Sequence, residues 1–335
     1  MTYKKVGVDI NKINIFKQKL KDICKGSQTN EVLKDLGSFA SLFAFYRNKY
    51  KNPVLISSAD GVGTKLKIAQ LVNKHNTVGI DLVAMNVNDI LCLGAKPLFF
   101  LDYIAYAKLR QQILISILKG INKGCVLAGC SLIGGETAQM PDMYREGEYD
   151  LAGFCVGVAE KNRIIDGRNI KEHDLVIGIA SNGLHSNGFS LVRKVLSEKE
   201  IKQYIHQLLK PTQIYVRPIL KILSTYQLSN LEAIKGIAHI SGGAFYKKAI
   251  KILPSEYGMV IDKKSWVVPK IFKIIQEKGK IEEKEMYTVF NMGVGMILVT
   301  KSKFAKAIIA KLSTFGLKSW VIGQIIKSSK KIEII

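Results

Sequence analysis

The sequence lacks the features of a membrane or secreted protein. No apolar run reaches about 18 residues without a charged or amide side chain, the length at which a run is read as a membrane-spanning helix. The first residues, MTYKKVGVDINKINIF, contain neither the apolar stretch nor the small-residue cleavage site of a secretory signal. We therefore expect no membrane partner and a cytoplasmic location.

Cysteine is scarce, and several enzyme motifs are missing. No two cysteines have the C-x-x-C spacing of zinc and redox motifs, and their number is odd. There is no G-x-x-x-x-G-K-[ST], no H-E-x-x-H and no G-x-S-x-G, which argues against a P-loop, a zincin and a serine hydrolase. We expect buried, reduced thiols at the five positions, Cys24, Cys92, Cys125, Cys130 and Cys155.

Acidic residues are few relative to basic ones. The chain has 27 Asp and Glu against 50 Lys and Arg, a formal net charge of +23. Clustered basic residues bind nucleic acid by releasing counterions from its backbone. Here the lysines are scattered, without a basic block interleaved with aromatic residues and without a recognition-helix or zinc-finger pattern. We expect no nucleic-acid partner, whereas anionic small molecules are compatible with the charge.

What is present indicates two domains of the α/β (α+β) class. With 335 residues and 47% apolar content, the chain is long for one domain. The hydrophobic pattern lapses in the polar segment KNRIIDGRNIKEHD, so we predict domains over residues 1–165 and 166–335, with a polar arm at the start. The predicted strands are 54–58, 97–107, 131–138, 149–160, 174–181, 258–262, 288–300 and 319–326, and the clearest predicted helices are 63–73, 77–94 and 111–130.

The run SSADGVGTK has the composition of a phosphate-binding turn between a strand and a helix. Its glycines, Gly61 and Gly63, would let backbone amides approach phosphate oxygens. Asp60 could hold a hard cation, and Lys65 would offer a positive charge. The spacing is weakly specific, because Asp-Gly is a common turn dipeptide and a plain turn explains it equally well.

The predicted helix 77–94 carries polar residues on an otherwise apolar surface. Its apolar residues follow helical spacing, whereas Asp81, Asn88 and Asp89 lie toward another side. Since an uncompensated buried carboxylate is costly, these residues either face solvent or gather around a metal. Asp60 and Asp89 together would suit Mg²⁺, which prefers carboxylates, waters and phosphate oxygens.

Two further glycine-rich segments carry candidate site residues. Glu136 follows a glycine pair in SLIGGETAQMP, where it is either an ordinary exposed side chain or a contact to Mg²⁺ or a ribose hydroxyl. His185 lies in SNGLHSNGFSLV, between a predicted strand and a helix that Ser186 or Asn187 could cap. A lone His is more often exposed or structurally bonded. Similar glycine-rich segments are AHISGGAF and, within a predicted strand, FNMGVGM.

Taken in order, these fragments resemble the phosphoribosylformylglycinamidine cyclo-ligases, or aminoimidazole ribonucleotide synthetases. The matching fragments are GVDI, SSADGVGTK, GIDLVAMNVNDIL, GAKPLFFLDY, GGETAQMP, DLAGFCVGV, SNGLHSNG, AHISGG and FNMGVGM, and they span nearly the whole chain. The resemblance implies a two-domain PurM-like fold. It also implies a homodimer, in which the amino-terminal mixed sheets form an intersubunit barrel beside the ATP sites and each chain adds a carboxy-terminal α/β domain.

The resemblance also implies a reaction that uses ATP and Mg²⁺. Formylglycinamidine ribonucleotide would be converted into aminoimidazole ribonucleotide, ADP and phosphate by way of an imidate phosphate. Phosphorylation turns the poor leaving oxygen of an amide into a good one, and ring closure is then intramolecular, so the protein mainly positions groups and stabilises charge.

Matching positions give each candidate residue a role that the resemblance implies. The metal ligands would be Asp60, Asp89 and Glu136, and the catalytic residues would be His185 and Lys65. ATP and its phosphates would contact Lys21, Asp60, Gly61, Gly63, Thr64, Lys65 and Asp81, and the ribonucleotide would contact Glu136, Ser186 and Asn187.

The sequence departs from the family pattern at three places. The segment 35–43 is poor in glycine, Ser58 and Ala59 precede Asp60 where a glycine is usual, and Ala244 stands where a third glycine is expected. We expect retained activity with a modest change. The alternatives are another Mg-ATP enzyme of the same superfamily, such as a thiamine-phosphate kinase or a selenophosphate synthetase, and a non-catalytic basic binding protein.

Overall fold

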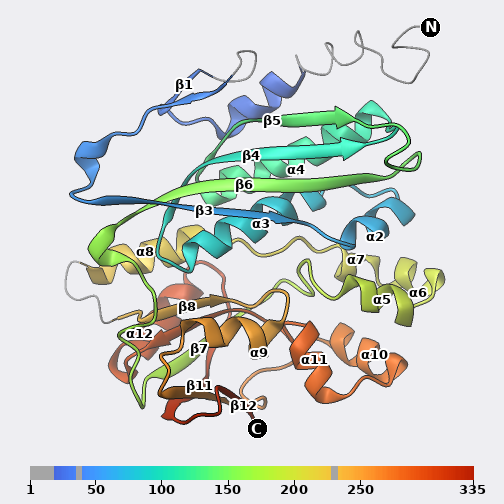
Figure 1. Cartoon of the computed structure of the whole chain (residues 1–335). Coiled ribbons are helices and arrows are strands. Elements are labelled where there is room, and N and C mark those ends of the chain that lie inside the picture. Colours follow the sequence, from blue (N-terminus) through green and yellow to red (C-terminus); the bar gives the residue numbers. More distant parts are fainter. Residues whose placement is uncertain (1–18, 35–39, 228–232) are drawn as a thin grey trace, which may run out of the picture.

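The chain forms two large sheets, one from each half of the sequence. The computed structural model describes residues 19–34, 40–227 and 233–335. A four-stranded sheet uses only residues before 161 and a six-stranded sheet only residues after 174, and Figure 1 shows the first above the second. No helix in these ranges is long and apolar enough to cross a membrane.

The sheet of the amino-terminal half has two long helices on one face. Its strand order is β3-β6-β4-β5, and only β4 and β5 are parallel neighbours. In Figure 1 the helices α3 and α4 lie behind it. The elements are β3 (Pro53–Gly61), β4 (Lys96–Tyr106), β5 (Ser131–Gln139), β6 (Tyr149–Glu160), α2 (Lys65–Leu71), α3 (Val78–Leu91) and α4 (Gln111–Ala128).

The other face of this sheet is open in a single chain. Leu55 of β3 and Phe154 of β6 are 63% and 45% exposed, although both are large and apolar. They point away from α3, because Gly153, the neighbour of Phe154, faces Leu82 of that helix. A small hairpin precedes the sheet, with elements η1 (Lys25–Ser27), β1 (Val32–Lys34), β2 (Leu42–Phe43) and η2 (Arg47–Lys49).

The sheet of the carboxy-terminal half has the order β12-β9-β11-β7-β10-β8. All neighbours are antiparallel except β12 and β9. The strands are β7 (Leu175–Ala180), β8 (Gly236–His239), β9 (Tyr257–Ile261), β10 (Val294–Thr300), β11 (Ser319–Lys327) and β12 (Ile332–Ile334). The helices are η3 (Lys161–Arg163), α5 (Phe189–Val195), α6 (Glu198–Gln203), α7 (Ile205–Leu208), α8 (Val216–Gln227), α9 (Ala244–Lys248), η4 (Ala249–Ile252), α10 (Lys270–Gly279), α11 (Glu283–Val289) and α12 (Ser302–Ser313).

Helix α3 lies at the centre of the molecule. It packs on β3, β6 and α4 of its own half and on α8 and β8 of the other half, so almost all of its residues are buried. Asn88 donates to the backbone oxygen of Gln213 at 2.8 Å and accepts from the amide of Tyr215 at 3.1 Å. The expectation that Asp81 and Asn88 face solvent or a metal is therefore wrong, because both side chains bond to the carboxy-terminal half.

Two predicted boundaries differ from the structure, those of β3 and β10. β3 continues past residue 58 because it pairs with β6 as far as Gly61, which places Asp60 inside the strand. β5 pairs with β4 through Gln139, so Glu136 lies inside a strand, in agreement with the strand predicted over residues 131–138. Residues 288 and 289, predicted to begin a strand, are instead the end of helix α11 (Glu283–Val289), and β10 begins at Val294.

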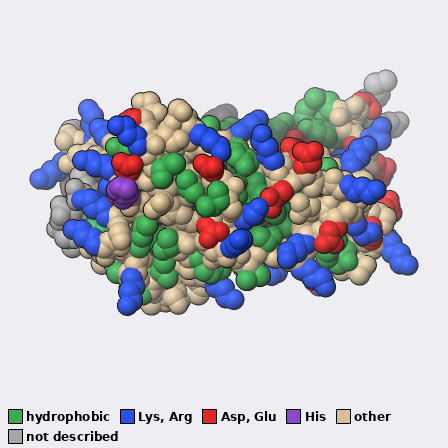
Figure 2. All heavy atoms as spheres, turned by 90° about the horizontal axis from the view of Figure 1, so that it is seen from below, with side chains coloured by type: hydrophobic (Ala, Val, Ile, Leu, Met, Phe, Trp, Pro, Cys, Tyr) green, Lys and Arg blue, Asp and Glu red, His purple; other side chains and the backbone are tan. Residues whose placement is uncertain are grey.

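The cysteines and the surface charges follow the sequence-based expectations. All five cysteines are free, four are buried and Cys92 is half-buried, which confirms the prediction of mostly buried thiols. Figure 2 shows Lys and Arg side chains spread over the face seen from below, with Asp and Glu among them. Residues 1–18 of the predicted arm and residues 35–39 of the glycine-poor loop lie outside the described residues.

Candidate active site

Two carboxylates of the amino-terminal half lie close together where β3 ends. Asn86 of α3 donates to the backbone oxygen of Asp60 at 3.3 Å, which fixes the helix against this end of the strand. Burial raises the pKa of Asp60, and the negative charge of Asp89 adds to the rise, while the Gly61 amide that donates to Asp60 Oδ1 at 2.8 Å offsets part of it. The two carboxylates repel each other, and a cation between them would remove that repulsion.

The carboxy-terminal half supplies two basic partners to Asp89. His239 Nδ1, at the end of β8, lies 2.8 Å from Asp89 Oδ1, and Lys248 Nζ, at the end of α9, lies 4.0 Å from Oδ2. Burial alone would raise the pKa of Asp89, but the hydrogen bond and charge of His239, together with Lys248, hold it below its usual value. Sequence reasoning missed both partners, although the position of His239 at the start of AHISGG was an available signal.

The donor set of this carboxylate pair fits Mg²⁺. In the described part of the chain, no group of three or more His, Cys, Asp or Glu residues could hold a metal by itself. Mg²⁺ commonly takes one or two protein carboxylates and completes its shell with waters and substrate phosphate oxygens. Asp60 and Asp89 would therefore hold Mg²⁺ together with the phosphates of a ligand.

Glu136 lies on the opposite face of the sheet from Asp60. Asp60 pairs with Gly153, which pairs with Asp102, which pairs with the glycine before Glu136. Paired residues point to the same face of a sheet and successive residues to opposite faces. Since Gly153 faces α3, Asp60 points toward the helices and Glu136 toward the open face. A single chain thus does not bring Glu136 to Asp60 and Asp89.

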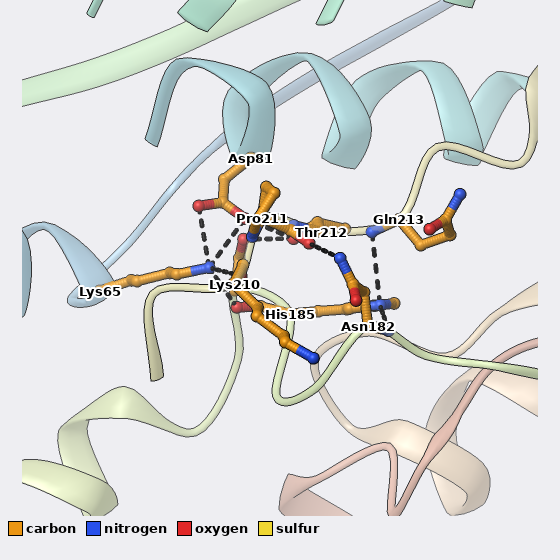
Figure 3. A network of polar contacts seen from close by, with 9 residues as sticks. Lys65, Asp81, Asn182, His185, Lys210, Pro211, Thr212 and Gln213 are labelled. Atoms are coloured by element: carbon orange, nitrogen blue, oxygen red, sulfur yellow. Dashed lines mark hydrogen bonds and ion pairs between the residues drawn. The ribbon is translucent and has the colours of Figure 1, made fainter. Parts of the chain in front are cut away.

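The loop between β7 and α5 holds His185 in a buried, bonded position. Its Nε2 atom lies 3.0 Å from the amide nitrogen of Asn182 and 3.4 Å from that of Gln213, and Figure 3 shows these contacts. Because Nε2 accepts, the ring proton lies on Nδ1, which is buried and has no hydrogen-bond partner in the described structure. Burial lowers the pKa of His185 well below its usual value, and the charges of His239 and Lys65 lower it further.

Lys65 and Asp81 form a fully buried ion pair instead of facing an open pocket. Lys65 Nζ donates to Asp81 Oδ1 at 2.9 Å, to the backbone oxygen of His185 at 2.9 Å and to that of Lys210 at 2.7 Å (Figure 3). An ammonium has three N–H donors, so none remains for a phosphate. The roles predicted for Lys65 and Asp81 as phosphate contacts thus have no support in this geometry.

Ser186 and Asn187 do not cap the helix that follows them. Gly188, with φ of +79°, is the N-cap residue of α5, and no side chain accepts from the amides of that helix. The capping prediction is wrong, because a glycine with positive φ makes the turn instead. Ser186 Oγ lies 2.9 Å from Thr212 Oγ1, and Asn187 Oδ1 lies close to Gly242.

Four buried polar atoms without partners gather around the loop of residues 181–188 and the turn of residues 239–243. Buried polar groups nearly always have a hydrogen-bond partner, so unpaired ones mark a place for a ligand or water. The rings of His185 and His239 lie 6.5 Å apart. Among the buried unpaired atoms of the described residues, the four in this region are His185 Nδ1, Asn187 Nδ2, His239 Nε2 and Ser241 Oγ.

The predicted phosphate turn is open at Gly63. This residue has φ of +69°, and a Cβ built there would meet no atom within 4 Å, so glycine suits both the conformation and a close approach by a ligand. Thr64 Oγ1 lies 2.9 Å from Ser190 Oγ of α5. Lys21 lies in the first described helical turn, and no hydrogen bond or ion pair among the described residues joins it to the other predicted site residues.

Ala244, which stands where the family pattern has a glycine, has a strained backbone conformation. Ala244 is buried and has φ of +40°, a conformation that costs a non-glycine residue roughly 1–2 kcal/mol. It directly follows Gly243, which has φ of +85°. The turn beside His239 and Ser241 therefore keeps a glycine-type backbone although its third glycine is missing.

Family models and known relatives agree on one family. The models of the AIR synthase related protein family match residues 44–159 (N-terminal domain) and 171–335 (C-terminal domain), and the chain belongs to this family. It is 50% identical to the phosphoribosylformylglycinamidine cyclo-ligase of Syntrophus aciditrophicus (strain SB), over 98% of this chain and 96% of that protein. It is 51% identical to the enzyme of the same name from Pseudothermotoga lettingae, over 99% of both chains.

Solved structures share the fold at low sequence identity. Thiamine-monophosphate kinase from Stenotrophomonas maltophilia K279a has a TM-score of 0.66 and 14% identity over 94% of this chain and 95% of that one. The hydrogenase maturation protein HypE of E. coli has a TM-score of 0.69 and 12% identity over 95% of this chain and 92% of that one. These likenesses confirm the predicted two-part α/β fold, and they say nothing about which reaction this chain performs.

The environment of His185 predicts one tautomer and no charge near neutral pH. Histidine labelled with ¹⁵N should give a His185 signal of the Nδ1–H form, assigned by its loss in a His185→Gln variant. This signal should not titrate between about pH 6 and pH 8, because the lowered pKa keeps the ring neutral. A shift toward imidazolium within that range, or a mixture of tautomers, would contradict this geometry.

Proposed function

We propose that this chain is an ATP-dependent cyclo-ligase of purine synthesis. It would convert formylglycinamidine ribonucleotide into aminoimidazole ribonucleotide, ADP and phosphate. The observation that carries the proposal is the name shared by relatives at about 50% identity over nearly the full length of both chains. We further propose that the protein acts in the cytoplasm. We also keep the proposed division of the chain into domains of residues 1–165 and 166–335.

The geometry supports a division of labour between the two halves. In the amino-terminal half, Asp60 and Asp89 would hold Mg²⁺ on the phosphates of ATP, with the open turn at Gly63 beside them. Mg²⁺ would supply neutralisation of phosphate charge. Structures of HypE with ATP and of T. maritima PurL with ADP show nucleotide bound on this fold, which agrees with an ATP site here.

The carboxy-terminal half would orient the ribonucleotide. The unpaired Nδ1–H of His185 could donate to the formyl oxygen or to the phosphate that it carries, and Asn187 could donate from its unpaired amide. Ring closure needs the amidine nitrogen held against the activated carbon, so donors fixed by the protein lower the barrier by orientation. His239 would hold the Asp89 carboxylate in place through their hydrogen bond.

The remaining predicted site residues lie outside the group formed by Asp60, Asp89, His185 and His239, and we propose more limited roles for them. Ser186, hydrogen-bonded to Thr212, would contact the ribonucleotide through its backbone or hydroxyl. Gly61 and Thr64 would line the phosphate turn, and Lys21 would approach the phosphates from the amino-terminal side. Glu136 would contact a ligand on the open face of the sheet, where a second chain could complete the site.

The activity test is product formation by the purified chain with Mg-ATP. With formylglycinamidine ribonucleotide present, ADP release should match aminoimidazole product one for one, and omission of the ribonucleotide should abolish both. Turnover of a thiamine phosphate in place of the ribonucleotide would move the assignment to a sister enzyme. Salt-sensitive binding to nucleic acid without any ATP turnover would favour the non-catalytic alternative.

The carboxylate pair predicts the effect of replacing Asp89 by Asn. The amide keeps the size and can still bond to His239, but it removes a charged ligand, so kcat/KM for Mg-ATP should fall on the order of 100-fold or more. The urea midpoint should change little. A matched control is Glu333→Gln, which neutralises a surface carboxylate beside Lys330 and should leave both quantities unchanged. Unaltered use of Mg-ATP by Asp89→Asn would remove Asp89 from the metal site.

We also propose a homodimer that covers the open face of the amino-terminal sheet. The exposed Leu55 and Phe154 lie on that face, and a second copy of the sheet would bury them and pair its edges. A Leu55→Asp/Phe154→Asp variant should therefore elute as a monomer near 37.3 kDa in light scattering, while the unmodified chain has twice that mass. Phe315→Asp, at another exposed aromatic position just beyond α12, should leave the dimer intact. A dimer that survives both aspartates would place the interface elsewhere.

A further inference from the structure

The buried ammonium of Lys65 joins three segments that are far apart in the sequence. Its three contacts are Asp81 of α3, the backbone oxygen of His185 and the backbone oxygen of Lys210. The first belongs to the amino-terminal half, and the other two belong to loops of the carboxy-terminal half. The side chain of Lys65 has no exposed surface, so the contacts are not shared with solvent.

Asp81 also bonds to the loop that contains Lys210. Its Oδ1 atom accepts from the amide and the hydroxyl of Thr212, both at 2.7 Å. The next residue, Gln213, donates its amide to the His185 ring. The carbonyl of His185 is thus held by Lys65, and its ring is held by the segment that Asp81 anchors (Figure 3).

Stability alone is a weak reason for such an arrangement. Taking two charges out of water is costly, and replacement of a buried ion pair by apolar residues of similar volume is often neutral or stabilising. What apolar residues cannot supply is directional bonding to a chosen carbonyl and a chosen amide. The position of Lys65 adds to this, because it begins α2 directly after the glycine turn that follows Asp60.

We propose that Lys65, Asp81 and Thr212 are positioning residues, which hold His185 at a fixed distance from the Asp60–Asp89 pair and do not touch substrate. The inference rests on the proposed cyclo-ligase activity, since a fixed distance matters only if His185 and the carboxylate pair act on one ligand. It replaces the phosphate-binding roles that the sequence suggested for Lys65 and Asp81.

The sharpest single substitution is Thr212→Val. Valine keeps the shape and the backbone amide but removes the hydroxyl that bonds to Asp81 and Ser186. A small displacement of a positioned group costs up to about 100-fold in rate, so kcat should fall roughly 10- to 100-fold while KM for ATP changes less than about threefold. Thr212→Ser keeps the hydroxyl and should restore most of kcat.

A double variant tests the ion pair itself. Lys65→Met/Asp81→Leu removes both charges together, so no unpaired charge is left in the interior. The matched control is Lys235→Met/Asp174→Leu, which removes the buried pair of the carboxy-terminal half, where Lys235 Nζ lies 2.7 Å from Asp174 Oδ2. The kcat of Lys65→Met/Asp81→Leu should fall at least as far as that of Thr212→Val, whereas the control variant should have an unchanged kcat. These expectations hold whether or not the urea midpoint of either variant changes.

The ¹⁵N signal of His185 gives a readout that is independent of turnover. In the unmodified chain the Nδ1–H form should dominate. In Thr212→Val a second tautomer or a titrating ring should appear, because the segment that carries the Gln213 amide loses one of its two bonds to Asp81. Failure of the unmodified chain to cyclise formylglycinamidine ribonucleotide would defeat the proposed function, and this signal would still report on the positioning.

Three results would overturn the positioning role of Lys65, Asp81 and Thr212. A Thr212→Val variant with unchanged kcat and an unchanged His185 signal would overturn it. A folded Lys65→Met/Asp81→Leu variant with normal kcat would also overturn it, as would a large rise in KM for ATP at unchanged kcat, which would mean that these residues contact the nucleotide. If the double variant fails to fold, Thr212→Val and Thr212→Ser decide the question.

Discussion

A single buried cation, the ammonium of Lys65, fixes the contact between the two halves of the chain. The ammonium of Lys65 sits without solvent between a helix and two loops, and an uncompensated charge there would be far too costly to keep. Each acceptor must therefore stay where it is: the Asp81 carboxylate and the carbonyls of His185 and Lys210. The course of both loops, and with them the places of His185 and Thr212, follows from that requirement.

Periodic sequence predicted the parts of the fold that are decided locally. In α3, α4 and β6 the hydrophobic residues repeat with the period of a helix or a strand. These elements lie within a few residues of the predicted bounds. The end of β3 was less predictable, because this strand continues as long as β6 offers pairing. The last two residues of α11, Thr288 and Val289, were predicted as strand, since both residue types favour strands and the packing of this helix against α9 could not be foreseen.

The candidate site was predictable only in part, for a related reason. Asp81, Asn88 and Asp89 look alike in the sequence, yet only Asp89 remains available, because the other two bond to a loop more than 100 residues away. Glu136 was expected beside Asp60, but the choice of sheet face depends on a register that a sequence does not contain. The segment AHISGG was noticed, but the sequence did not assign His239 a role, because its partner Asp89 is 150 residues away.

The central place of α3 also restricts how a ligand can enter. Many two-part enzymes open about a hinge and close over their substrate. Here a rotation of one half against the other would pull Asp81 from Thr212 and Lys65 from the carbonyls of two loops, and a buried charge left without its partners costs about 3–5 kcal/mol. The halves consequently behave as one block. Ligands would then enter past the turn around Gly63, which has open space beside it and takes no part in these buried bonds.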